Sequence, residues 1–101
     1  MEKVNEYEAM VVLNARPTDE QIKDRFENFL NLIRSNGELT EEVEDMGRRR
    51  LAYDIEDEKE GYYFLVRFKA NPSFPKEFER QLRIDDQILR FLVIRTDDQK
   101  D

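Results

Sequence analysis

The segment that most constrains the fold is residues 62–69, where two sets of side chains alternate along the chain. Successive side chains of a β-strand point to opposite faces of a sheet, so an alternation of this length predicts a strand. One face of this strand would carry Tyr62, Phe64, Val66 and Phe68. The other face would carry Tyr63, Leu65, Arg67 and Lys69. The first set predicts a face against the core, and the rest of the chain has to cover it.

The first third of the chain is typical of a strand followed by a helix. In residues 7–13, one face would carry Tyr7, Ala9, Val11 and Leu13, and the other Met10 and Val12. Thr18 and Gln21 have the spacing of a capping box, which marks the start of a helix. The apolar residues that follow at helical spacing predict one buried stripe, formed by Ile22, Phe26, Phe29, Leu30 and Ile33. We expect the helix to end at Gly37 in a left-handed cap.

Residues 38–54 form a long and very polar extended segment, which predicts a strand at the edge of the sheet. Gly47 would mark a bulge or bend in that strand. Residues 55–61 then form an acidic hairpin loop. A shorter helix over residues 74–82 and a last strand over residues 87–96 complete the chain, with Phe91 and Val93 directed toward the core.

The expected order of elements is therefore β-α-β-β-α-β, two strand–helix–strand halves on one sheet. We predict a single α+β domain over residues 1–101, with its core over residues 5–97 and short polar ends. The sheet would be four-stranded and antiparallel, in the order 4-1-3-2. Both helices would cover the face that includes Phe64.

The face of the sheet that the helices leave open would be largely apolar, with basic residues at its margin. It would carry Met10, Val12, Tyr63, Leu65, Arg67, Ile88, Arg90, Leu92 and Ile94. Contiguous apolar patches of this kind usually mark a partner site. The alternative is that these strands simply have high β-propensity and that the chain's own tail covers the patch.

Positive charge is concentrated at one place, where Arg48, Arg49 and Arg50 follow one another between two acidic stretches. Such a cluster suggests a contact with a phosphate or a partner carboxylate, or else it only balances charge at a strand end. The net charge of −7 argues against a free-standing nucleic-acid binder, because affinity for phosphate comes mainly from Lys and Arg. It leaves room for one local RNA contact and would attract a basic partner.

The composition excludes several classes of site. The chain has no His and no Cys, which removes the usual zinc sites, histidine-based catalysis and a cysteine nucleophile. We therefore expect no enzyme, metal, cofactor or small-molecule substrate. The lack of cysteine favours an intracellular protein, and the longest apolar run is too short to span a bilayer.

The motif at residues 47–55 resembles the signature of bacterial small-subunit ribosomal protein six: a glycine, basic residues, Leu-Ala-Tyr, an acidic residue and Ile. Residues 61–64 and 82–86, followed by Ile88, Arg90 and Val93, are similar to later blocks of that family. Tyr7-Glu8 before an apolar strand is similar to its opening. The resemblance covers residues 5–97.

This resemblance implies a ferredoxin-like fold and a structural role in the ribosome. It implies binding to the central domain of 16S ribosomal RNA as a heterodimer with ribosomal protein eighteen, in the cytoplasm. The residues expected at RNA are Arg48, Arg49, Arg50, Tyr53, Arg83 and Arg90. The residues expected at the protein partner are Met10, Val12, Tyr63, Leu65, Arg67, Leu92 and Ile94. A regulatory or dimerisation module that uses the open sheet is the alternative.

Overall fold

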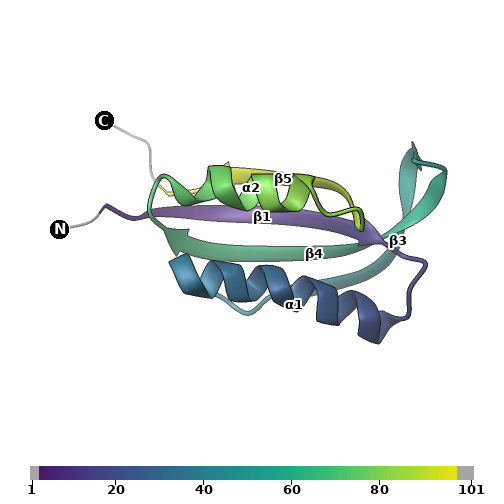
Figure 1. The fold of residues 1–101 in the computed structure, drawn as a ribbon, viewed down its shortest axis with the longest axis horizontal. Helices are drawn as coiled ribbons and strands as arrows, with labels where there is room; N and C mark the ends of the chain where they lie inside the picture. The colour runs from purple at the N-terminus through teal and green to yellow at the C-terminus, as the bar shows by residue number, and fades with distance from the viewer. Residues whose placement is uncertain (1–2, 98–101) are drawn as a thin grey trace.

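The computed structural model describes residues 3–97, so the polar ends predicted at residues 1–2 and 98–101 lie outside it. Two helices and five strands follow one another along the chain (Figure 1). They are β1 (Asn5–Asn14), α1 (Asp19–Asn36), β2 (Gly37–Leu39), β3 (Glu44–Ile55), β4 (Glu58–Ala70), α2 (Phe74–Arg83) and β5 (Ile88–Arg95). The predicted α+β class and the ferredoxin-like β-α-β-β-α-β arrangement are confirmed.

The five strands form one antiparallel sheet with β4 and β1 in its interior. The order is β2-β4-β1-β5, and β3 pairs with β4 on the same side as β2. This agrees with the predicted order 4-1-3-2, with one difference. The single edge strand expected over residues 38–54 is two strands, because residues 40–43 are not part of a strand, although the backbone N–H of Thr40 still donates a hydrogen bond to the carbonyl of Arg67 on β4 (3.0 Å).

The edge of the sheet bends where the sequence predicts it. Gly47 has a φ of 76°, in the left-handed region that a glycine adopts without steric cost. The pairing of β3 with β4 shifts register between Asp45 and Gly47, which is the predicted bulge.

Helix α1 begins with the predicted capping box. The hydroxyl of Thr18 accepts a hydrogen bond from the backbone N–H of Gln21 (3.2 Å), and the Gln21 side chain accepts one from the backbone N–H of Thr18 (3.0 Å). The end of the helix differs from the prediction. Gly37 has a φ of −178°, an extended conformation, and no left-handed cap forms. A side chain at Gly37 would instead collide with the backbone carbonyl of Lys69, because β2 approaches β4 closely here.

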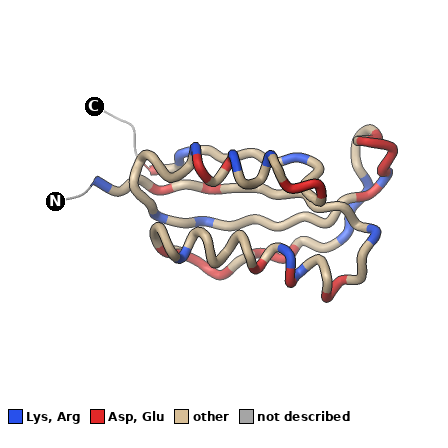
Figure 2. Tube along the Cα trace, viewed as in Figure 1, with Lys and Arg blue, Asp and Glu red and all other residues tan. Residues whose placement is uncertain are grey.

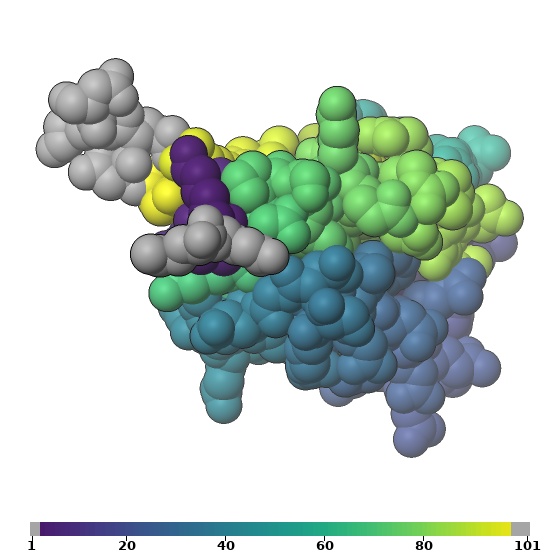
Figure 3. Space-filling model, turned by 60° about the vertical axis from the view of Figure 1, so that its left-hand side comes forward, coloured from purple at the N-terminus to yellow at the C-terminus, as the bar shows by residue number. Residues whose placement is uncertain are grey.

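The core lies between the helices and one face of the sheet. The two helices cover that face side by side, as the space-filling view shows (Figures 1 and 3). All five residues predicted for the apolar stripe of α1 are buried. Phe64 is 3% exposed and stacks on Phe26 of α1, with ring centroids 4.1 Å apart. Phe74, Phe78 and Leu82 fix α2 over the same face.

One residue of the last strand lies on the opposite face from the one predicted. Ile88 was expected on the open face, but it is 8% exposed and belongs to the core. The register between β1 and β5 shifts between Val12 and Leu13, which face Arg90 and Ile88. The intervening Leu89 is therefore an extra residue, and one extra residue moves every side chain before it to the other face.

Candidate RNA and partner interface

The three consecutive arginines of β3 do not form one patch, because the strand directs them alternately to its two sides. Arg48 lies opposite Tyr62, whose ring faces the helices, while Arg49 lies opposite Gly61 and points to the open face. Arg50 lies opposite Glu60, back on the side of Arg48. The sequence places the three side by side, and the pleat of the strand separates them.

Arg48 is held by the polypeptide itself. Its guanidinium donates hydrogen bonds to the backbone carbonyls of Ala15 (3.2 Å) and Pro17 (3.0 Å), and it pairs with Asp19 at the start of α1. It also lies over the ring of Tyr62, 5.8 Å from the centroid. Arg48 therefore fastens the β1–α1 loop to the edge of the sheet.

Arg49 and Arg50 remain open to solvent. Within residues 3–97, neither pairs with a carboxylate, and Arg49 makes one long hydrogen bond to the backbone carbonyl of Met46 (3.3 Å). Arg50 borders a hollow beside Arg16 and Glu58, which pair with each other at 2.8 Å. Of the cluster, these two are the arginines whose charge is available to another molecule.

The remaining residues predicted at RNA gather where the β3–β4 hairpin meets the start of β5. Arg90 donates a hydrogen bond to the hydroxyl of Tyr53 at 3.5 Å, and Tyr53 is 63% exposed. A hollow of about 350 Å³ is lined by Arg83, Arg90 and Glu56 of the hairpin tip. Figure 2 shows basic residues at the base of this hairpin and acidic residues at its tip. The structure thus joins Arg90 to Tyr53 by a hydrogen bond and places Arg90 and Arg83 along one hollow.

Next to Arg48 lies Tyr62, a titratable group whose pKa the fold shifts. It is 4% exposed and donates a hydrogen bond to the carboxylate of Asp45 (2.9 Å). Burial, followed by that hydrogen bond and the charge of Asp45, raises the pKa of Tyr62 to about 12 from its ordinary value of 10.0. The neutral phenol is the form that this site stabilises.

We expect Tyr62 to make the fold sensitive to alkaline pH. Since its pKa is higher in the folded chain, its contribution is present below pH 10 and is lost as the pH rises toward 12. The loss should be about 2–3 kcal/mol of unfolding free energy. Urea melts between pH 9 and 12 measure it as the difference between the wild type and Tyr62→Phe, because other groups titrate equally in both. A difference that stays constant over this range would contradict the prediction.

The open face of the sheet carries the residues predicted at the protein partner. Leu92 and Ile94 are 63% and 44% exposed, and Met10, Tyr63 and Leu65 are half-buried. The tail that could have covered them belongs to the undescribed residues. Within residues 3–97, this face has no helix over it.

Val12 differs from the expectation of an exposed residue, because it is only 2% exposed. It lies on the predicted face, but its side chain occupies the space above Gly61, together with the side chain of Leu51. Leu51, at 7% exposure, was not singled out from the sequence as a residue of this face. The sequence feature that could have identified Leu51 is its position as an apolar residue directly after three arginines.

Arg67, expected at the partner, is the centre of an ion-pair cluster. Its guanidinium bonds to Glu8 on β1 (2.9 Å), to Glu41 in the β2–β3 connection (3.1 Å) and to Glu44 on β3 (3.1 Å). The hydrogen bond to Glu44 and the neighbouring carboxylates raise the pKa of Arg67. The sequence did not reveal this cluster, since its members become neighbours only through strand register.

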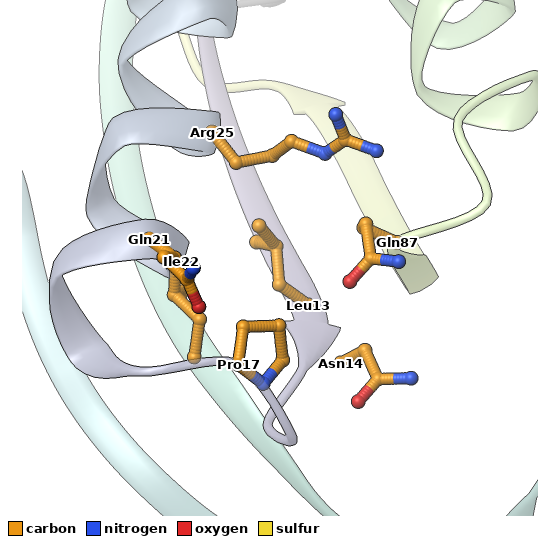
Figure 4. A pocket seen from close by; sticks show the side chains of 7 residues that line it. All are labelled: Leu13, Asn14, Pro17, Gln21, Ile22, Arg25 and Gln87. Carbon is orange, nitrogen blue, oxygen red and sulfur yellow. The ribbon is translucent and has the colours of Figure 1, made fainter.

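A further hollow, of about 300 Å³, lies between the end of β1 and the start of α1 (Figure 4). Leu13, Pro17 and Ile22 form its apolar lining, and the amide side chains of Asn14, Gln21 and Gln87 surround it. Its one charged residue, Arg25, is already paired with Asp85 at 3.2 Å. This arrangement offers no unpaired charge to a ligand.

The described part of the chain, residues 3–97, contains no group of three or more acidic side chains placed to hold a metal ion. Within the same residues, neither helix has the length and apolar content needed to cross a membrane.

Comparison with known proteins shows which family has this sequence and fold. The sequence model of the family described as ribosomal protein S6 matches residues 6–95. The small ribosomal subunit protein bS6 of Clostridium novyi is 44% identical over 88 residues, which cover 87% of this chain and 93% of that protein. The protein of the same name from Paenarthrobacter aurescens is 42% identical over 94 residues, 93% of either chain.

A solved structure agrees with the sequence relatives. The crystal structure of 30S ribosomal protein S6 from Thermotoga maritima superposes with a TM-score of 0.85. It is 27% identical and covers 92% of this chain and 88% of its own. The chain therefore belongs to the ribosomal protein S6 family, whose members are structural, non-enzymatic proteins of the small ribosomal subunit.

Proposed function

We propose that this protein binds the central domain of 16S ribosomal RNA together with ribosomal protein eighteen, as a single-domain structural component of the cytoplasmic ribosome. Arg49 and Arg50 contact RNA phosphates, and Arg83, Arg90 and Tyr53 form a second RNA contact around the hairpin. The apolar residues of the open face contact the protein partner. No cofactor or small-molecule substrate takes part.

The observation that carries the RNA contact is the exposure of two unpaired arginines on an acidic chain. The net charge is −7, so a phosphate backbone is repelled by most of the surface. Arg49 and Arg50 are placed on the edge strand without a carboxylate partner in residues 3–97, where they are free to meet phosphate oxygens. Arg48 belongs to the β1–α1 loop anchor and contributes less to this contact.

The net negative charge also means that tight RNA binding requires a basic partner protein. Two free arginines and the hairpin group give few phosphate contacts, and each contact contributes only about 0.7–0.9 to the slope of log affinity against log salt. A basic protein on the open face adds contacts and lowers the repulsion. The alternative, a dimerisation module that uses the same face, requires no RNA.

The test is RNA affinity with and without the partner at matched salt. We expect the isolated protein to bind a central-domain fragment of 16S RNA weakly, and ribosomal protein eighteen to increase its affinity by at least about tenfold, because the partner supplies the missing positive charge. Filter binding over a salt series measures both affinities. Equal affinity in the two conditions would contradict the proposal, and dimerisation of the isolated protein without RNA binding would favour the alternative.

A further inference from the structure

The turn between β3 and β4 contains a residue that is poorly suited to it. Ile55 pairs with Glu58, so the loop of the hairpin consists of Glu56 and Asp57 alone. Their φ angles are 50° and 67°, in the left-handed region that a type I′ turn requires at both positions. Gly, Asn and Asp adopt this conformation readily, whereas a glutamate adopts it at a cost. A costly residue at an exposed turn points to a function other than stability.

Glu56 lines the same hollow as Arg83 and Arg90. Within residues 3–97, no ion pair involves Glu56. The two arginines are also largely available, because Arg83 lies 3.7 Å from Glu79 and Arg90 contacts only the hydroxyl of Tyr53. A carboxylate beside two arginines weakens their attraction for phosphate. The hollow is therefore a poor site for a phosphate alone, and Glu56 has to match a different group of the ligand.

The rest of the hollow is apolar. Its lining is completed by Leu82 and Ile88, which are buried, and by Leu89 and Phe91, which are half-buried. At about 350 Å³, it is at the lower end of the range of about 300–1,000 Å³ for small-molecule sites. Two cations, one carboxylate and an apolar surface complement the three parts of an unpaired nucleotide: its phosphate, the hydrogen-bonding edge of its base and the face of its base. Unpaired nucleotides are also the parts of RNA whose bases proteins recognise most often.

We propose that this hollow binds one unpaired guanine nucleotide of the RNA, with its phosphate at Arg83 and Arg90 and the Watson–Crick edge of its base at Glu56. A carboxylate accepts hydrogen bonds and donates none. Guanine matches it because N1–H and the N2 amino group are adjacent donors, whereas the other three bases place an acceptor beside each donor. The inference rests on the proposed function and goes beyond it. The arginines attract any phosphate, and Glu56 selects the base.

The test is the affinity of the full-length protein for a central-domain fragment of 16S RNA, measured with ribosomal protein eighteen present. The variant Glu56→Gln keeps the length of the side chain but loses its charge and one of its two acceptor oxygens. The matched control Asp57→Asn removes the same charge from the same turn, at a residue that does not line the hollow. Thermal melts check that both variants fold.

The sign of the change in affinity separates two roles of Glu56. If the carboxylate only repels phosphate, its removal should strengthen RNA binding. We expect Glu56→Gln instead to weaken binding about tenfold, as the loss of a bidentate base contact does, without changing the salt slope. Asp57→Asn should stay within about twofold of the wild type. Arg90→Gln should lower the salt slope by about 0.7–0.9, because it removes a phosphate contact.

Chemical probing of the RNA identifies the base. Kethoxal reacts with N1 and N2 of unpaired guanines, the two atoms that the proposed contact covers. At saturating protein, we expect one guanine that is protected by the wild type to react with kethoxal in the Glu56→Gln complex. The remaining protections should be the same in both complexes.

Other results would overturn the inference in distinguishable ways. If Glu56→Gln binds RNA as well as Asp57→Asn does, or more tightly, Glu56 makes no base contact. If Glu56→Gln binds more weakly but exposes an adenine or cytosine to dimethyl sulfate, or exposes no base, the assignment of guanine is wrong. A wild type that does not bind the RNA even with the partner present would remove the proposed function itself, and the inference with it.

Discussion

Replacing Phe64 with alanine should lower the free energy of unfolding by about 3–5 kcal/mol, the range for a buried aromatic residue cut back to alanine. The side chain lies at the centre of the core, where it stacks on Phe26 and contacts the ring of Tyr62 at 5.0 Å between centroids. Alanine removes the buried area and leaves a cavity between α1 and the sheet, which close packing prevents from collapsing completely.

The measurement is chemical denaturation of the wild type and two comparison variants. Phe64→Leu keeps most of the volume and should lose about 1–2 kcal/mol. Leu92→Ala, at a residue that is 63% exposed, should stay within about 0.5 kcal/mol of the wild type. A loss below about 1 kcal/mol for Phe64→Ala would mean that this core position tolerates a cavity, against the rule for buried aromatics.

Reversing the charge of Arg49 and Arg50 together, as Arg49→Glu/Arg50→Glu, should leave the fold nearly intact and weaken assembly with RNA. Both side chains are exposed and lack a carboxylate partner in residues 3–97, so little stability depends on them. If each arginine meets one phosphate, the slope of log affinity against log salt should fall by about 0.7–0.9 for each phosphate that is no longer neutralised. At physiological salt we expect affinity to fall by about 30-fold or more, since glutamate also repels phosphate.

The comparison variants separate charge from position. Arg34→Glu/Arg80→Glu makes the same change in net charge on the exposed sides of α1 and α2, where both arginines pair within their own helix. Its RNA affinity should remain well above that of the Arg49/Arg50 variant. Arg48→Glu should behave differently again and lower the melting temperature, because it places a carboxylate beside Asp19 and two backbone carbonyls.

The two explanations of the arginine cluster predict different results. If the Arg49/Arg50 variant keeps both the affinity and the salt slope of the wild type, the arginines only balance local charge at the strand end. If its melting temperature falls strongly, they stabilise the fold through the neighbouring acids. Affinity should be measured on the complex with partner and RNA, across a salt series.

The sequence was sufficient for features that depend on neighbours along the chain. The period of two in residues 62–69 identified the strand and its buried face, including Phe64. The period of 3.6 and the Thr18–Gln21 pair identified α1, its start and its stripe. These patterns are local, because side-chain direction within one element follows from backbone geometry alone. The order of such elements also limits how they can form a sheet, which is why the topology was predictable.

Tertiary structure alone decided the features that depend on register between distant segments. The bulge at Leu89 places Ile88 in the core, and the connection over residues 40–43 divides the edge strand into β2 and β3. The cluster around Arg67 joins Glu8 to Glu44, which are 36 positions apart in number and neighbours only after pairing. Likewise, the sequence showed that Arg48, Arg49 and Arg50 are adjacent. Only the structure showed that the pleat of β3 turns Arg48 toward the loop before α1, where its guanidinium is hydrogen-bonded to backbone carbonyls. A residue type and its position along the chain fix its charge and its local conformation, but the atoms it meets depend on how the paired strands align.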